Sequence, residues 1–153
     1  MTYSVSLQHV VPRPLAAVRA QMPIAQVPAR FGALLSEVYD FAKREHVALD
    51  GQNVFVYQSS ESPLTDVLFG VGVHAPFPQN GRVELAATPE GDAATTTHWG
   101  DYSALGAAHN AVVAWCKREE HALTGTCWEV YGHWSDDPAK RRTDVYQLIQ
   151  RTQ

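Results

Sequence analysis

A single carboxylate stands in the middle of an aromatic and β-branched segment, CWEVYGHW, at residues 127–134. The composition of this segment predicts a β-strand. Side chains alternate along a strand, so one face carries Cys127, Glu129, Tyr131 and His133. If that face is buried, the carboxylate of Glu129 needs an internal arginine, a hydroxyl group or an incoming ligand as its partner. If the strand lies at an edge, Glu129 is an ordinary exposed residue, and both interpretations stay open.

The same segment ends an internal repeat. KREHVALDGQNVFVY (43–57) and KREEHALTGTCWEVY (117–131) align without gaps, 74 residues apart, and eight of the fifteen positions are identical. Average composition would give roughly one identity. Glu129 aligns with Phe55, which favours a covered position for the carboxylate. We therefore predict one domain over residues 1–153, with repeats at about 1–77 and 82–153 and a turn-rich linker between them.

Both copies predict the order strand, strand, helix, strand, strand. The first copy gives strands at 5–11, 15–21, 53–58 and 66–75, and a helix with Pro28 in its first turn. The second gives strands at 83–88, 93–99, 127–134 and 143–150. Hairpins should dominate, since PRP and PEGD read as turns between the first two strands of each copy. The predicted fold is α+β, with a largely antiparallel sheet and the helices on one side.

The helix of the second copy spans about residues 100–122. Its apolar positions are Leu105, Val112, Val113 and Cys116. Asp101 or Ser103 is expected to cap its start, and Gly125 to follow its C-terminus.

The charge, the cysteine positions and the hydrophobicity of the chain argue against several classes of protein. The net charge is −4, and Lys and Arg do not cluster, so a general nucleic-acid binder is not expected. Cys116 and Cys127 have no metal-like spacing, and no disulfide framework, metal site or cofactor is expected. Without a leader or a long apolar run, we expect a cytoplasmic protein with no membrane contact.

The second half resembles the GyrI-like, or effector-binding, domain family. HWGDYSALGAAHNAVVAWCKREE is followed by CWEVYGHW and TDVYQLI, with the family's Gly-x-Tyr at Gly100 and Tyr102 and its Glu-x-Tyr at Glu129 and Tyr131. The resemblance is good from about Ala93 to Ile149 and looser before that. It implies two pseudo-symmetric units around a central cleft that binds lipophilic, often cationic, aromatic molecules. With no helix-turn-helix segment at either end, a stand-alone member without direct DNA binding is expected.

The resemblance implies that Glu129 is the counter-charge for such a ligand. Aromatic faces would stack on a flat cation, at about 0.5–2 kcal/mol each. The residues expected to bind the ligand are Glu129, Tyr131, Tyr102, Trp99, Tyr57, Phe55, Phe77 and His133. For each aromatic residue alone, ordinary core packing is the alternative.

Two other functions stay open. In a hydrolase that opens an electrophilic cyclopropane-type ring, Glu129 would act as the base, and Tyr102 or Tyr131 would stabilise the oxyanion. An interaction protein, such as a gyrase-binding partner, or a homodimer formed through an edge strand, is the third possibility.

Overall fold

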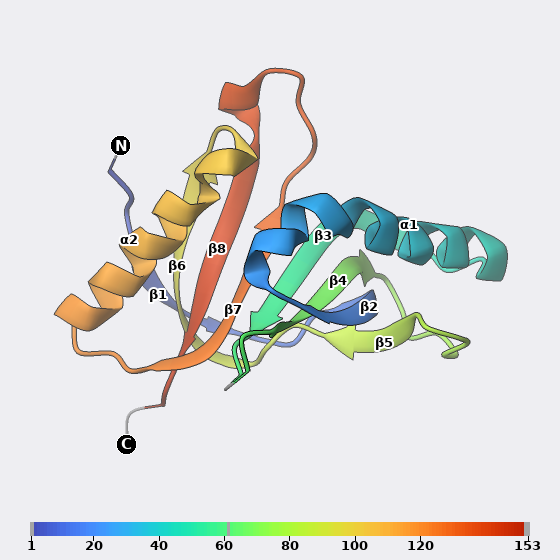
Figure 1. The fold of residues 1–153 in the computed structure, drawn as a ribbon, viewed down its shortest axis with the longest axis horizontal. Helices are drawn as coiled ribbons and strands as arrows, with labels where there is room; N and C mark the ends of the chain where they lie inside the picture. The colour runs from blue at the N-terminus through green and yellow to red at the C-terminus, as the bar shows by residue number, and fades with distance from the viewer. Residues whose placement is uncertain (1, 61, 152–153) are drawn as a thin grey trace. The chain divides into compact units, whose positions relative to one another are not determined.

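The fold is α+β, with antiparallel strands and two α-helices (Figure 1). The computed structural model describes residues 2–60 and 62–151. The elements of this part are β1 (Ser6–Val10), β2 (Pro14–Met22), α1 (Val27–Glu45), β3 (Leu49–Gln58), β4 (Thr65–Val73), β5 (Glu84–Ala87), β6 (Gly91–Trp99), α2 (Leu105–Arg118), β7 (Leu123–Tyr131) and β8 (Arg142–Ile149). The short 3-10 turns are η1 (Ile24–Gln26), η2 (Tyr102–Ala104) and η3 (Pro138–Lys140). The predicted fold class and element order are confirmed.

The chain forms two compact units whose boundaries differ from those of the sequence repeats. Unit 1 combines the segment up to Val11 with the chain from Pro89 onward, and unit 2 is Pro12–Thr88. The first strand of each repeat is exchanged: β1 pairs with β6 in unit 1, and β5 pairs with β2 in unit 2.

The predicted hairpins at the start of each repeat are therefore wrong. Prolines flank Arg13 and follow Thr88, between the two strands that each predicted hairpin would have paired. At these places the chain continues to a different strand and does not form a tight turn. Arg13 and Thr88 lie near the two ends of unit 2 and are hydrogen-bonded to each other. Arg13 N donates to Thr88 Oγ1 at 2.8 Å, and Thr88 N donates to Arg13 O at 3.0 Å. The hairpin-like pairs β3–β4 and β7–β8 are present as antiparallel neighbours.

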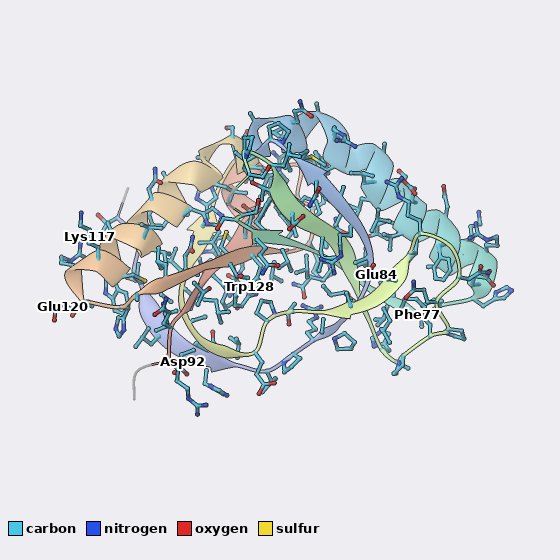
Figure 2. The ribbon with its side chains drawn as sticks, turned by 60° about the horizontal axis from the view of Figure 1, so that its bottom comes forward. Phe77, Glu84, Asp92, Lys117, Glu120 and Trp128 are labelled. Atoms are coloured by element: carbon cyan, nitrogen blue, oxygen red, sulfur yellow. The ribbon has the colours of Figure 1, made fainter. Side chains whose placement is uncertain are left out.

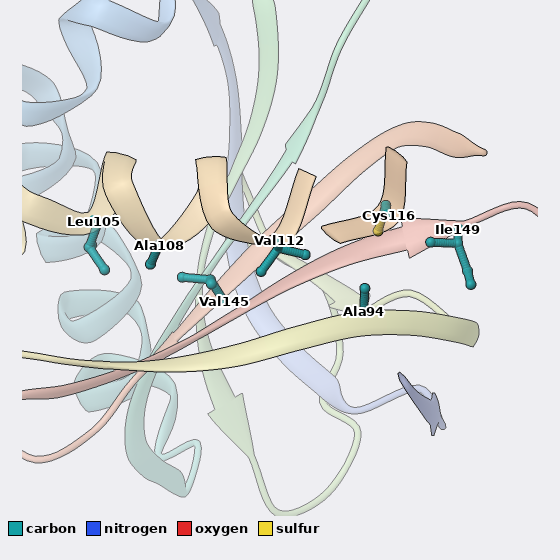
Figure 3. Close-up of a cluster of buried hydrophobic side chains, with 7 residues drawn as sticks. All are labelled: Ala94, Leu105, Ala108, Val112, Cys116, Val145 and Ile149. Carbon is teal, nitrogen blue, oxygen red and sulfur yellow. The ribbon is translucent and has the colours of Figure 1, made fainter. Parts of the chain in front are cut away.

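In unit 1, the strand order is β1-β6-β8-β7, and α2 packs across β6 and β8 (Figure 1). Figure 3 shows the cluster that joins the helix to the sheet. It consists of Ala94, Leu105, Ala108, Val112, Cys116, Val145 and Ile149. The prediction for Val113 is wrong, because its side chain is 36% exposed and Ala108 takes the core position. The buried helix residues thus follow the i, i+3, i+7 and i+11 spacing of one face.

In unit 2, the strand order is β3-β4-β2-β5, and α1 contacts β2 and β4. The helix buries Val27, Leu34, Leu35, Val38, Phe41 and Ala42. Pro28 lies in its first turn, as predicted. The matching positions of α2, 74 residues later, include Ala108, Val112 and Cys116, so the repeat extends through the helices.

A non-glycine residue in the left-handed conformation follows each helix. His46 comes directly after α1 with φ 56°, and Glu120 comes two residues after the end of α2 with φ 62°. Figure 2 labels Glu120 where the chain leaves α2. Gly125 was expected to close α2; instead it lies inside β7 with φ 92°, where the register with β8 shifts between Leu123 and Cys127. Gly51 has the equivalent place and a φ of 78° in β3. Both glycines therefore form β-bulges.

The start of α2 follows the prediction. Asp101 Oδ1 accepts the backbone N–H of Ser103 at 3.0 Å and caps the 3-10 turn that leads into the helix. Among the described residues, neither helix has the length and apolar content required to cross a bilayer.

Candidate functional site

Glu129 is a buried residue of β7, with only 6% of its surface exposed. It pairs with Val145 of β8, whose side chain belongs to the cluster under α2. Because cross-strand neighbours point to the same face, Glu129 points toward α2. The alternative of an exposed Glu129 is wrong, because only 6% of its surface is accessible. The bulge at Gly125 shifts the register just before this stretch and so helps to set which face Glu129 takes.

Two side chains hold the carboxylate. His109 of α2 places Nε2 2.8 Å from Oε2, and the Tyr131 hydroxyl donates to Oε1 at 2.6 Å. The His109 side chain is 19% exposed, so this contact lies at the margin of the core. Imidazole and phenol can hold a carboxylate by hydrogen bonds alone, without a full opposite charge. These two contacts tie the carboxylate to the helix α2 and to its own strand β7.

An aromatic row continues from Tyr131 to the surface. The rings of Tyr102 and Tyr131 meet edge to face, with centroids 5.4 Å apart, and Trp134 lies 6.1 Å from Tyr102. The guanidinium of Arg141 stands 3.8 Å from the centroid of Trp134 and 5.8 Å from that of Tyr102. Trp134 is 63% exposed. The row therefore connects a buried carboxylate to an open aromatic face that can hold a cation.

Thr143 adds an unsatisfied polar atom beside this row. It pairs with Tyr131 across the β7–β8 ladder and is fully buried. Among the described residues, its Oγ1 is a buried side-chain oxygen without a hydrogen-bond partner. Leaving a buried hydroxyl unpaired costs about 1–3 kcal/mol, so Thr143 is a local cost to the stability of the β7–β8 pair.

Burial also controls Cys127, which precedes Glu129 on the same face. Loss of solvent, together with the nearby charge of Glu129, raises the pKa of the Cys127 thiol to about 12. The thiol stays protonated near neutral pH and is therefore a poor nucleophile. Burial likewise raises the pKa of Cys116.

Two predicted ligand-binding residues of unit 1 lie apart from Glu129. Trp99 pairs with Arg142, which places its ring on the sheet face opposite α2, where the Arg142 guanidinium lies 5.8 Å from it. His133 follows the end of β7 and is exposed. The alternation of side chains along β6 explains the position of Trp99, since its neighbour His98 takes the inner face. His98 is buried and contacts the Tyr3 hydroxyl and the Asp101 carbonyl.

The predicted residues of unit 2 lie in that unit's own core. Phe55 is 4% exposed and meets Phe69 edge to face at 5.1 Å. Phe77 packs against Phe41 with ring centroids 5.5 Å apart. Tyr57 is 8% exposed. Their assignment to a ligand site stays a prediction, and the contacts above are those of core residues.

Sequence reasoning missed four residues of this arrangement: His109, Trp134, Arg141 and Thr143. His109 was not among the residues expected to bind the ligand. The repeat held the signal, because position 109 aligns with Leu35, which is buried in α1. A buried helix position that is leucine in one copy and histidine in the other marks a change from packing to polar contact. Arg141 and Thr143 gave no such signal, since the repeat alignment stops at Tyr131.

Two hollows lie elsewhere on the units. One of about 460 Å³ is bordered by Glu45, His46, Phe77 and Asn80, and one of about 470 Å³ by Ser6, Thr95, Arg142 and Asp144. Phe77 is the one predicted site residue that borders either of them. Over residues 2–60 and 62–151, His, Cys, Asp and Glu form no group of three that could hold a metal ion.

Comparison with known proteins gives a fold and no family name. No family model matches the chain, and no curated protein does. Solved structures match over nearly the whole chain. The C-terminal domain of EcmrR is 19% identical with a TM-score of 0.78, covering 99% of this chain and 100% of that domain. This protein has the fold of the EcmrR C-terminal domain. The chain spans 58% of the longer EcmrR chain in its DNA complex.

Two more distant neighbours share the fold. SAV2435, determined with tetraphenylphosphonium bound, is 9% identical with a TM-score of 0.64, covering 98% of this chain and 94% of its own. A protein from Listeria innocua described as a hydrolase is 12% identical with a TM-score of 0.58, covering 95% of this chain and 91% of its own. At these identities the likeness concerns architecture alone.

Proposed function

We propose that unit 1 binds a small lipophilic, aromatic cation, with Glu129 as the counter-charge and Tyr131, Tyr102 and Trp134 as stacking partners. The observation that carries this proposal is a buried carboxylate held by an imidazole and a phenol, at the inner end of an aromatic row. In this reading the protein senses or sequesters its ligand.

Electrostatics support a cation over a neutral ligand. Glu129 is 6% exposed, so its charge acts through a medium that screens less than water. The rings add cation–π attraction of about 0.5–2 kcal/mol each. A neutral ligand of the same shape would gain the apolar contacts and lose both of these contributions.

The fold neighbours support the same class of ligand. SAV2435 shares this architecture and was determined with tetraphenylphosphonium, which is a lipophilic aromatic cation. The resemblance of Gly100, Tyr102, Glu129 and Tyr131 to the GyrI-like pattern points in the same direction.

Thermal unfolding in the presence of tetraphenylphosphonium tests the proposal. At a hundredfold excess over Kd, binding to the folded state adds about 2.7 kcal/mol, which raises Tm by about 5–10 °C. Triphenylphosphine oxide, a neutral aromatic compound, should raise Tm less. Glu129→Gln keeps an acceptor for His109 and Tyr131, removes the charge, and should abolish most of the response to the cation.

The matched control is Glu84→Gln, which removes an equal charge from a surface ion pair with Arg19 (3.0 Å) in unit 2. This variant should respond to tetraphenylphosphonium as the wild type does. Equal responses of wild type and Glu129→Gln would refute the role of Glu129, and a wild type without any response would refute the binding function for this probe.

A second function, hydrolysis of an electrophilic cyclopropane-type ring, is favoured by the Glu129–His109 contact. Glu129 would take a proton from water, whose oxygen attacks a ring carbon and breaks a ring bond. The electron pair of that bond moves to a carbonyl beside the ring, where Tyr102 or Tyr131 donates a hydrogen bond, and the proton then returns to carbon. Mass spectrometry of an incubated activated cyclopropane should then show the addition of one water, and this product should disappear in Glu129→Gln.

A further inference from the structure

Arg141 occupies the outer face of the aromatic row. Its guanidinium carbon is 3.8 Å from the centroid of Trp134, within stacking distance, and 5.8 Å from that of Tyr102. Both distances lie inside the range of about 6 Å over which a cation is attracted to a ring. An internal cation therefore already holds the aromatic surface that a ligand cation would need.

The loop between β7 and β8 keeps the guanidinium in this place. Arg141 Nε donates to the Ser135 carbonyl at 2.9 Å, and the Arg141 carbonyl accepts the Gly100 N–H at 2.9 Å. The backbone N–H of Arg141 donates to Pro138 O at 3.1 Å, which closes the 3-10 turn η3. The arginine is thus anchored on both its main chain and its side chain, and its stacking is a property of the folded loop.

We infer that Arg141 acts as an internal substitute for the ligand cation and sets the affinity that a ligand must exceed to occupy the aromatic row. This inference rests on the proposed function above. A cation must displace the guanidinium from Trp134 and Tyr102 before it stacks there. Small ammonium ions gain little from the exchange, because they replace one cation–π contact with another. Large aromatic cations gain ring–ring contact in addition, so they displace the guanidinium at concentrations at which small ammonium ions do not.

The variant Arg141→Gln tests this role through two probes, tetraphenylphosphonium and tetramethylammonium. Removing the competing cation should tighten tetraphenylphosphonium binding by about three- to tenfold. It should tighten tetramethylammonium binding by a similar factor, because both ligands must displace the same guanidinium. Arg141→Lys keeps the charge without the planar group and should fall between wild type and Arg141→Gln.

The neighbouring residue provides a matched control. Arg142→Gln removes the same charge one position later, but its guanidinium lies near Trp99 on the opposite face of the sheet. General attraction of cations to a more negative protein would affect both variants equally. If Arg141→Gln binds no tighter than Arg142→Gln, or binds more weakly than the wild type, the inference is overturned.

A measurement without ligand separates this inference from the proposed function. Ring current from Trp134 should shift the Arg141 Nε–H resonance upfield in the empty wild type, and Trp134→Leu should remove the shift. A resonance at the ordinary position would overturn the inference even if tetraphenylphosphonium binds. Tighter binding of tetraphenylphosphonium by Arg141→Gln than by the wild type would support it, and binding by neither would overturn both proposals.

Discussion

Equivalent positions of the two units carry opposite chemistry. In unit 2, Leu35 of α1 and Phe55 of β3 are buried, with 8% and 4% of their surfaces exposed. In unit 1, the residues 74 positions later are His109 of α2 and Glu129 of β7, which contact each other at 2.8 Å. The same helix-on-sheet arrangement is thus completed by apolar residues in one unit and by a polar pair in the other.

This difference indicates that the polar pair is not needed for folding. Replacing buried ionic groups by apolar residues of similar volume is often neutral or stabilising, because the charges no longer lose their hydration. Unit 2 demonstrates that apolar residues can complete this place in the fold. The proposed binding role gives Glu129 and His109 a function that packing alone does not require.

A second comparison concerns the partners of two carboxylates, Asp50 in unit 2 and Glu129 in unit 1. Asp50 in unit 2 is bound by the guanidinium of Arg13 and by the backbone N–H of Gln52 at 2.8 Å. Partial burial alone would raise the pKa of Asp50, but the hydrogen bonds from Arg13 and Gln52 outweigh it and the pKa is lowered. The contacts of Asp50 thus include a guanidinium, and those of Glu129 include an imidazole and a phenol.

The largest change in stability is expected when the carboxylate of unit 1 is introduced at the equivalent position of unit 2. Phe55→Glu buries a carboxylate beside Phe69 and Phe31, so we expect a loss of about 3–5 kcal/mol in the free energy of unfolding. Urea unfolding measures this loss. Phe55→Leu, which keeps the position apolar, should cost less than about 1.5 kcal/mol. A Phe55→Glu variant as stable as Phe55→Leu would show that unit 2 can accommodate a buried carboxylate as unit 1 does.

The converse exchange introduces the apolar residues of unit 2 at the equivalent positions of unit 1. The double variant His109→Leu with Glu129→Phe should be as stable as the wild type or more stable, by up to about 1–4 kcal/mol. It should lose its response to tetraphenylphosphonium, because the counter-charge is gone. Urea unfolding and thermal shift measure the two quantities. A loss of more than about 2 kcal/mol would instead assign the pair a structural role.

A smaller effect is expected from Asp50→Asn, which we predict to lower the free energy of unfolding by about 1–3 kcal/mol at pH 7. The folded-state pKa of Asp50 is lowered, so its stabilisation is present above the unfolded pKa of about 3.9 and is lost as pH falls through the folded value. The difference between wild type and Asp50→Asn should therefore shrink as pH falls below about 4. A difference that stays constant down to pH 2 would contradict this role of Asp50.

Local sequence patterns predicted the elements and the repeat, and the repeat indicated a covered Glu129. The partners of the first strands could not be obtained in this way. The pairing of β1 with β6 brings together residues more than 80 positions apart, and local turn residues favoured a hairpin instead. The helix ends were misjudged for a similar reason. His46 and Glu120 take the left-handed conformation usually given to glycine, and the nearby glycines serve the bulges.

The repeat indicated the covered position of Glu129, whereas the assignment of a ligand site around it stays a prediction. Glu129 and Tyr131 lie inside the aligned stretch, and Tyr102 lies in the Gly-x-Tyr motif. Trp99 was included because it is aromatic and close to that motif, but its side of the strand depends on the register of β6 against β8. Arg141 contacts the aromatic row because the loop between β7 and β8 folds back on itself. The periodicity of apolar residues, from which helices and strands were predicted, does not describe the conformation of such a loop.

The smallest effect concerns Cys127, which reports the charge of Glu129 from within the site. With a pKa of about 12, raised first by burial and second by Glu129, only about one thiol in ten thousand is ionised at pH 8. In a Cys116→Ser background, iodoacetamide should therefore modify native Cys127 slowly. Adding Glu129→Gln removes the second cause and should speed the reaction by about two- to tenfold, whereas Glu84→Gln should leave it unchanged. The unfolded protein in urea gives the rate of an unprotected thiol. A native rate close to that value would contradict the burial of this face, and equal rates with and without Glu129→Gln would show that Glu129 carries no charge there.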